Sequence, residues 1–125
     1  MKKIIKTDLC PKAIGPYSQA VIAGNFMFAS GQIGIDPEKG CIVDGGIEPQ
    51  TKRVMENVKH LLEAAGFKLE DVIKANIFIT DMNNFNTVNK VYGEYFKKDE
   101  PARSCVEIKA LPKGALIEIE VIACK

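Results

Sequence analysis

One short stretch near the C-terminal end of the chain brings a cation, a thiol and a carboxylate to alternate positions. In a β-strand, Arg103, Cys105 and Glu107 would share one face. We then expect the apolar residues Val106 and Ile108 to point into the core. The planar guanidinium of arginine can hold a carboxylate through two parallel hydrogen bonds. Because the chain contains only 2 arginines, Arg103 is a candidate anchor for a substrate carboxylate.

The next strand-like stretch, residues 116–123, carries two candidate proton-transfer groups. Its apolar positions alternate with Glu118 and Glu120, which therefore project from the face opposite the core. A glutamate in a water-poor site has a raised pKa and can exchange protons with a substrate. We expect Arg103 to converge with these glutamates, and only Glu118 to reach the cleft, because alternate positions on a strand lie about 6–7 Å apart. The alternative is an ordinary solvated sheet face with arginine–glutamate pairs across strands.

Cys105 lies in the candidate site, but the sequence offers no evident base to activate its thiol. The single histidine, His60, falls between apolar residues of a helical stretch, so a Cys–His nucleophile is not expected. A small, semi-buried side chain is the simpler interpretation. The 4 cysteines are far apart and form no Cys-x-x-Cys pair. This spacing favours free thiols over a zinc or redox site, and we predict no metal ligands.

Two other stretches place hydroxyl groups beside glycine at the margins of strands. These are Gly-Pro-Tyr-Ser-Gln at 15–19, which includes Tyr17, and Ser30-Gly31-Gln32. Both patterns are also typical of ordinary turns. Gly31 and Gly34 do not form a phosphate-binding loop, because the lysine of a P-loop and the spacing of a dinucleotide motif are absent. We therefore predict no nucleotide cofactor.

The hydrophobic pattern predicts the elements that must position these residues. Alternating runs at 72–79, 103–108 and 116–123 indicate strands, and Gly24-Asn25 between two apolar runs indicates a hairpin over 21–29. The predicted strand at 72–79 directs Ile73, Ala75, Ile77 and Ile79 to the core. Helical spacing predicts helices at 49–65 and 84–96, and a further strand is expected at 3–7. The glycine-rich stretch 31–46 is predicted to be a structured loop.

This order of elements predicts an α+β fold in which a sheet is covered by helices on one face. The opposite sheet face then carries apolar side chains, Phe28, Phe78 and Ile122, beside polar groups. An exposed apolar face of this kind is usually buried against another surface. Association between subunits is the simplest way to bury it.

Length and charge limit the classes of function. The 125 residues are enough for a single domain over 1–125, and 17 basic against 16 acidic residues leave a net charge of +1. That balance argues against broad electrostatic binding to nucleic acid or to an anionic membrane. No signal-peptide pattern and no membrane-length apolar run is present, so we expect a cytoplasmic protein that is not in a membrane.

Five motifs in a fixed order make the sequence resemble a known family. They are Ile-Gly-Pro-Tyr-Ser-Gln-Ala at 14–20, Ala-Ser-Gly-Gln-Ile at 29–33, Glu-Asn-Val-Lys at 56–59, Pro-Ala-Arg-Ser-Cys-Val-Glu at 101–107, and Leu-Pro at 111–112 before Ile-Glu-Ile-Glu at 117–120. Together they resemble the Rid family of reactive imine and enamine deaminases, and within it the RidA subgroup. The resemblance covers nearly the whole chain.

The resemblance implies a chorismate-mutase-like α+β fold, with one mixed sheet and two helices on one face, and a homotrimer with clefts between subunits. It also implies a 2-iminobutanoate/2-iminopropanoate deaminase, which hydrolyses 2-aminoacrylate, 2-aminocrotonate and their imine tautomers to 2-oxo acids and ammonia without a cofactor. The residues that match family positions are Arg103 as substrate anchor, Glu118 as proton-transfer group, and Cys105, Tyr17, Ser30 and Gly31 as cleft residues.

The sequence is also compatible with two other functions. The same arginine-lined cleft would suit a regulatory protein that binds a small carboxylate without turnover. The resemblance also raises ribonuclease activity or inhibition of translation. The sequence shows neither the basic stripe nor the aromatic motif typical of RNA recognition, so nucleic acid is the less favoured partner.

Overall fold

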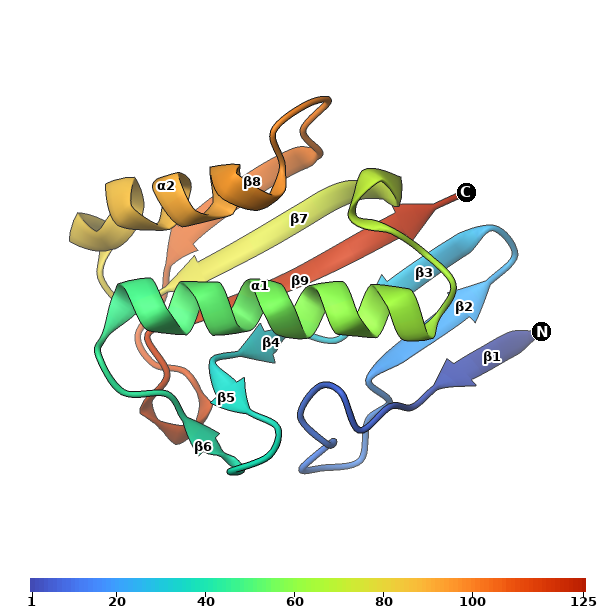
Figure 1. Ribbon diagram of the computed structural model, residues 1–125, viewed down its shortest axis with the longest axis horizontal. Helices are drawn as coiled ribbons and strands as arrows, with labels where there is room; N and C mark the ends of the chain where they lie inside the picture. The colour runs from blue at the N-terminus through green and yellow to red at the C-terminus, as the bar shows by residue number, and fades with distance from the viewer.

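In a computed structural model that describes residues 1–125, two helices lie against one face of a large β-sheet (Figure 1). The helices are α1 (Ile47–Ala64) and α2 (Phe85–Tyr95). The sheet strands are β1 (Lys2–Ile5), β2 (Ala20–Ala23), β3 (Phe26–Ala29), β4 (Gln32–Ile33), β7 (Val72–Ile79), β8 (Ala102–Glu107) and β9 (Ile117–Cys124). Short 3-10 turns span Leu69–Asp71, Met82–Asn84 and Pro112–Gly114. This arrangement confirms the predicted α+β class.

The sheet is mixed, and its strand order is β1-β2-β3-β9-β7-β8. The short strand β4 also pairs with β9, beyond the end of β3. Only the β7–β8 pair is parallel, and α2 forms the crossover between these two strands (Figure 1). β9 therefore lies in the middle of the sheet, whereas β8 is an edge strand.

Most predicted elements are present with small differences at their ends. The hairpin turns at Gly24, which has a positive φ of 59°. α1 begins at Ile47, so Pro49 lies inside its first turn, and Gly66 follows its end with a φ of 81°. The stretch predicted as a loop, 31–46, contains β4 and a small hairpin of β5 (Ile35–Asp36) and β6 (Cys41–Ile42).

The core lies between the sheet and the two helices. It is formed by the inward positions of β7 and β9, including Ile77 and Ile119, packed against the apolar faces of the helices. The prediction that Ile73 points inward is wrong. A register shift between Val72 and Lys74 bulges β7, so Val72 is buried and Ile73 is 46% exposed.

The predicted orientation of β8 is also wrong. β8 pairs with β7 so that Arg103 lies opposite Ala75, and Cys105 lies opposite Ile77. Ala75 and Ile77 are buried under the helices, so Arg103 and Cys105 face the helix layer. The expected core residue Val106 instead lies on the other face and is 45% exposed. Ile108, beyond the strand, is half-buried.

The sheet face away from the helices has the mixed character predicted from the sequence. Phe28 pairs with Ile122 on this face, and Phe78 pairs with Glu118. Phe28 is 47% exposed. The 4 cysteines are free thiols, and no helix is both long and apolar enough to cross a membrane.

Candidate active site

A cavity of about 380 Å³ brings together four of the six predicted site residues. Tyr17 comes from the loop before β2, Ser30 and Gly31 from the link between β3 and β4, and Glu118 from β9. The remaining wall is partly apolar and partly polar, and it includes Ile14, Ile33, Ile35, Lys12, Gln19 and Glu120. A cavity of this size fits a small metabolite.

Glu118 packs directly against the backbone of Gly31. A Cβ atom at position 31 would lie 2.8 Å from Cγ of Glu118 and closer still to its carboxylate. β4 pairs with β9 so that Ile33 lies opposite Glu118, which brings the two segments together. Glycine is therefore required at position 31 for the carboxylate to occupy its observed place.

The environment of Glu118 favours its protonated form. The side chain is half-buried, and this desolvation raises the pKa of Glu118. The neighbouring charge of Glu120 raises it further. Both glutamates line the cavity, so the prediction that only Glu118 reaches the cleft is wrong. The cavity extends along β9 far enough to include two alternate residues, Glu118 and Glu120.

The two glutamates differ in their partners. The Oε1 atom of Glu120 accepts a hydrogen bond of 3.1 Å from the side-chain amide of Asn76 on β7. Glu118 instead contacts the glycine backbone at position 31. Glu120 is thus held in place by the sheet, whereas Glu118 is the carboxyl group better suited to exchange a proton with a ligand.

The hydroxyl groups of Tyr17 and Ser30 have different hydrogen bonds. Ser30 Oγ donates to the carbonyl oxygen of Ser18 over 2.6 Å, so its proton is used inside the protein. Tyr17 Oη accepts from the backbone N–H of Ile14 over 3.3 Å, so its own proton is free to donate. Toward a ligand, Ser30 can accept a hydrogen bond and Tyr17 can donate one.

Gln19 has a structural role that the sequence did not reveal. Its side chain is 4% exposed. Its Oε1 accepts from Thr7 N–H (2.8 Å), and its Nε2 donates to the carbonyl oxygens of Thr7 (3.0 Å) and Pro11 (2.8 Å). These bonds hold the segment before Tyr17 against the start of β2, and residues of this segment line one wall of the cavity. The sequence carries no signal for this role, because the bonds join Gln19 to backbone groups 8 and 12 residues earlier in the chain.

Asn57 on α1 is a second residue that sequence reasoning missed. It is fully buried, and its Nδ2 donates to the carbonyl oxygens of Ile33 (3.2 Å) and Ile35 (3.0 Å). The amide thereby fixes the bend from β4 to β5, which carries the apolar cavity wall. A polar residue within the apolar face of a predicted helix was the available signal.

Arg103 lies outside this cavity. It lines a separate pocket of about 340 Å³ beside α2, where its Nη1 donates to Oδ1 of Asn89 over 2.7 Å. The predicted convergence with Glu118 and Glu120 is therefore wrong within one chain. β8 and β9 flank opposite sides of β7, and Arg103 faces the helix layer while the glutamates face away from it.

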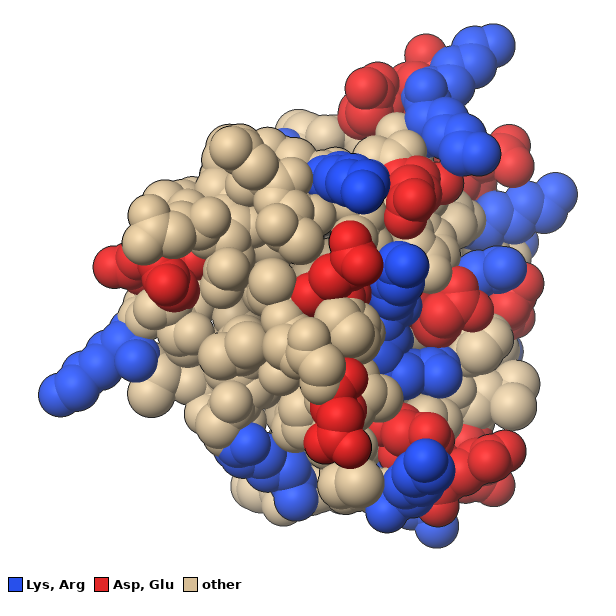
Figure 2. All heavy atoms as spheres, turned by 60° about the vertical axis from the view of Figure 1, so that its left-hand side comes forward, with Lys and Arg blue, Asp and Glu red and all other residues tan.

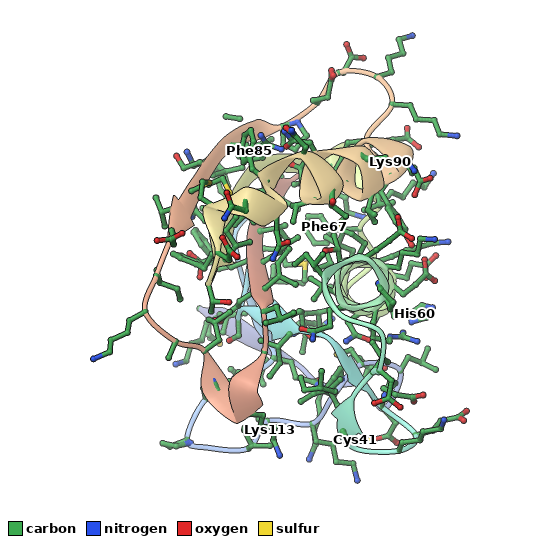
Figure 3. The ribbon with its side chains drawn as sticks, turned by 90° about the vertical axis from the view of Figure 1, so that its left-hand side faces the viewer. Cys41, His60, Phe67, Phe85, Lys90 and Lys113 are labelled. Carbon is green, nitrogen blue, oxygen red and sulfur yellow. The ribbon has the colours of Figure 1, made fainter.

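Cys105 also lies apart from the cavity and from any histidine. Its side chain is half-buried against the core, and burial raises the pKa of the Cys105 thiol despite the nearby charge of Arg103. His60 projects from α1 on the side away from the sheet (Figure 3), with Nδ1 3.2 Å from the carbonyl oxygen of Leu9. A raised thiol pKa without a base agrees with a role for Cys105 other than nucleophile.

The fold and the cavity define a small α+β protein with a metabolite-sized site next to its open sheet face. The model of the family described as Endoribonuclease L-PSP matches residues 7–125. The chain belongs to this family, and the likeness to Rid proteins expected from its motifs is confirmed.

Individual relatives are similar over almost the full chain. A RutC family protein of Pyrococcus horikoshii is 57% identical over 100% of this chain and 99% of its own length. The human 2-iminobutanoate/2-iminopropanoate deaminase is 45% identical over 98% of this chain and 90% of its own. The crystal structure of RidA from an Antarctic Psychrobacter species superposes with a TM-score of 0.96 at 43% identity, covering 98% of this chain and 99% of that one.

Proposed function

We propose that this protein hydrolyses reactive 2-imino acids and their enamine tautomers to 2-oxo acids and ammonia. The substrates are 2-aminoacrylate and 2-aminocrotonate, in equilibrium with 2-iminopropanoate and 2-iminobutanoate. The observation that carries the proposal is the half-buried Glu118 with its raised pKa, in a cavity with the free hydroxyl proton of Tyr17. The name of the human relative, a 2-iminobutanoate/2-iminopropanoate deaminase, supports it.

The complete site is built between two copies of the chain. Arg103 and Glu118 lie on opposite faces of one sheet, so an arginine that anchors a substrate beside Glu118 must come from a neighbouring molecule. The exposed apolar side chains of the open face, such as Phe28, give that neighbour a surface to cover. A homotrimer with three equivalent clefts satisfies both requirements with one repeated interface.

The reaction follows from these groups. Arg103 of one copy binds the substrate carboxylate in a bidentate manner and fixes the position of C2. Glu118 of the other copy takes a proton from water as the oxygen bonds to C2, and the C=N electron pair moves to nitrogen. Glu118 then returns the proton to nitrogen, which gives a tetrahedral intermediate with a hydroxyl and an amino group on C2. Glu118 next takes the hydroxyl proton and passes it to the amino group as the C–N bond breaks and the C=O bond forms, so ammonia leaves a 2-oxo acid. An enamine first takes up a proton at C3 and loses one from nitrogen to become the imine.

The other site residues orient the reactants. The Tyr17 hydroxyl can donate to the water or to the developing oxygen, and Ser30 Oγ can accept from the imine N–H. Gly31 leaves room for Glu118. We assign Cys105 a contact through its backbone, next to Arg103 on β8, and no covalent step.

The direct test is ammonia release from imines generated in solution by a pyridoxal-phosphate enzyme that dehydrates serine or threonine. The purified protein should accelerate ammonia release from both imines above the spontaneous rate. Heat-denatured protein at equal concentration is the control. No acceleration with either imine, together with stoichiometric binding of 2-oxobutanoate, would favour a regulatory carboxylate-binding protein instead.

Ribonuclease activity is the alternative that the description of the family model raises. Binding along an RNA backbone requires a continuous basic surface. Lys and Arg side chains on the face shown in Figure 2 are interspersed with Asp and Glu. We therefore favour the imine hydrolase, and RNA cleavage that persists in Arg103→Ala with a steep salt dependence would reverse this preference.

Replacing Gly31 by alanine should impair the site without unfolding the protein. The added Cβ displaces Glu118, whose flexible side chain can move aside, so the backbone can keep its course. Because a shift of about 1 Å at a reacting group can cost about 10²-fold, we expect a loss of that order in turnover. Steady-state imine hydrolysis and circular dichroism measure the two effects. Wild-type turnover in a folded Gly31→Ala protein would contradict the placement of Glu118.

Replacing Phe78 by glutamate should dissociate the homotrimer. Phe78 lies on the open sheet face, and burying an unpaired charge in a subunit interface costs several kcal/mol. Sedimentation should show monomers with an intact circular dichroism spectrum. Leu9→Glu is the matched control, because Leu9 is 61% exposed and lies outside the sheet. A wild-type protein that sediments near 13.7 kDa at micromolar concentration would refute the assembly.

A further inference from the structure

Three uncharged side chains of α2 surround the guanidinium of Arg103. Asn89 Oδ1 accepts a hydrogen bond of 2.7 Å from Nη1. Cζ of Arg103 lies 5.1 Å from the centre of the Tyr92 ring and 5.7 Å from that of Phe85. Phe85 stands at the start of α2 beside β8 (Figure 3), and the three residues follow the i, i+4, i+7 spacing of one helix face.

The neutrality of these contacts matters for a residue that must bind an anion. A carboxylate at position 89 would hold the guanidinium more tightly, but it would also occupy the donors and neutralise the charge that a ligand needs. The amide oxygen of Asn89 takes one donor of Arg103 and leaves the charge. Glu100 also lines this pocket, but its side chain is exposed to solvent.

Tyr92 stays neutral for a physical reason. Its side chain is 5% exposed, and its hydroxyl is buried without a hydrogen-bond partner. A phenol is protonated at physiological pH, and burial raises the pKa of Tyr92 to about 12, so it stays neutral well above that pH. The ring therefore offers its face to the guanidinium without a competing negative charge.

We propose that Asn89, with the rings of Phe85 and Tyr92, is a positioning cradle that fixes the direction of the Arg103 guanidinium while leaving its charge available for the substrate carboxylate. The inference rests on the proposed function, because that carboxylate is the intended ligand. Arginine has many rotamers, and a guanidinium already held in place by the protein loses less freedom when the ligand binds. Asn89 acts through Arg103 and is not itself a catalytic residue.

The first experiment measures the guanidinium directly and does not require activity. The chain has only Arg53 and Arg103, so the arginine side-chain signals in a ¹⁵N NMR spectrum are two sets, assigned with Arg53→Lys. Rotation about the Nε–Cζ bond of Arg103 should be slow in the wild type. It should be several-fold faster in Asn89→Ala. An equal rotation rate in the two proteins would overturn the cradle.

The second experiment separates positioning from a merely structural role. We expect Asn89→Ala to raise KM for imines and Kd for 2-oxobutanoate about tenfold, with kcat within a few-fold of wild type. Asn89→Asp keeps the acceptor oxygen and the shape, so it should melt like the wild type yet bind 2-oxobutanoate at least as weakly as Asn89→Ala. Asn25→Asp, the same change in the remote β2–β3 turn, should bind normally.

The results distinguish this inference from the proposed function. Wild-type binding and KM in a folded Asn89→Asp protein would show that any acceptor at position 89 suffices, and would overturn the inference even if imines are hydrolysed. A wild type that hydrolyses no imine would end the proposed function. In that case, the rotation rate of the Arg103 guanidinium and the binding of 2-oxobutanoate in the Asn89 variants would still test whether Asn89 positions Arg103.

Discussion

Glu118→Gln should lower the turnover of imine hydrolysis by about 10²–10⁴-fold, the usual contribution of a positioned acid–base group. Glutamine keeps the shape of the side chain and its contact with Gly31, but it cannot carry the proton between water and the imine nitrogen. Binding of 2-oxobutanoate should therefore change little. Steady-state ammonia release and titration calorimetry measure the two quantities separately.

Glu120→Gln is the matched control for this substitution, two residues along the same strand and in the same cavity. Glu120 is held by Asn76, and its replacement should lower turnover by no more than a few-fold. Equal turnover in the two variants would remove Glu118 from the mechanism. It would favour a solvated sheet face on which neither carboxylate has a special role.

The pH dependence of turnover follows from the raised pKa of Glu118. Burial is the main cause of this raised pKa, and the charge of Glu120 adds to it. The ionised carboxylate accepts the proton of water, so turnover should fall as the pH drops through this raised pKa. Glu120→Gln removes part of the shift and should move the fall to lower pH.

The contribution of Glu118 to thermal stability should also depend on pH. A carboxyl with a raised pKa in the folded state binds its proton more tightly there than in the unfolded chain. It therefore favours folding below the unfolded pKa of about 4.3, and this advantage is lost as pH rises through the folded pKa. Glu118→Gln should raise the Tm near neutral pH relative to wild type, and this difference should vanish below about pH 4.

Arg103→Lys should lower kcat/KM for imines by about 10²-fold, although the positive charge is kept. Lysine has no planar fork, so it cannot form the two parallel bonds to a carboxylate or the stacking on Tyr92 and Phe85. Arg53→Lys is the natural control. Arg53 donates from Nε to Asn57 over 3.0 Å on α1, a single bond that lysine can replace. Near-wild-type efficiency in Arg103→Lys would exclude Arg103 as the substrate anchor.

The periodic elements of this fold could be predicted because one pattern dominates each of them. Val54, Val58, Leu61 and Leu62 fall on one helical face and are all buried in α1. The faces of β8 could not be predicted in this way. Cys105 and Val106 are both acceptable in a core, and only the register with β7 decides which one faces the helices. The bulge at Ile73 is likewise set by pairing with β9.

The site residues that belong to sequence motifs could be predicted. The roles that depend on contacts between distant parts of the chain could not. Tyr17, Ser30, Gly31 and Glu118 were identified from the family motifs, and the fold brings them to one cavity. The roles of Gln19 and Asn57 depend on backbone groups 8–12 and 22–24 residues away in the sequence. The separation of Arg103 from Glu118 depends on the order of the strands in the sheet. The alternation of apolar and polar residues within one strand gives no information about that order.

The central claim is that each site combines Arg103 of one copy with Glu118 of another, and mixed oligomers test it most directly. Arg103→Ala and Glu118→Gln chains carrying different tags are produced together, and assemblies containing both are purified through the two tags. In a three-fold ring that contains both variants, about one site in three has both residues intact, so about a third of wild-type turnover should return although each variant alone is nearly inactive. No recovery in assemblies shown to contain both chains would contradict the shared site.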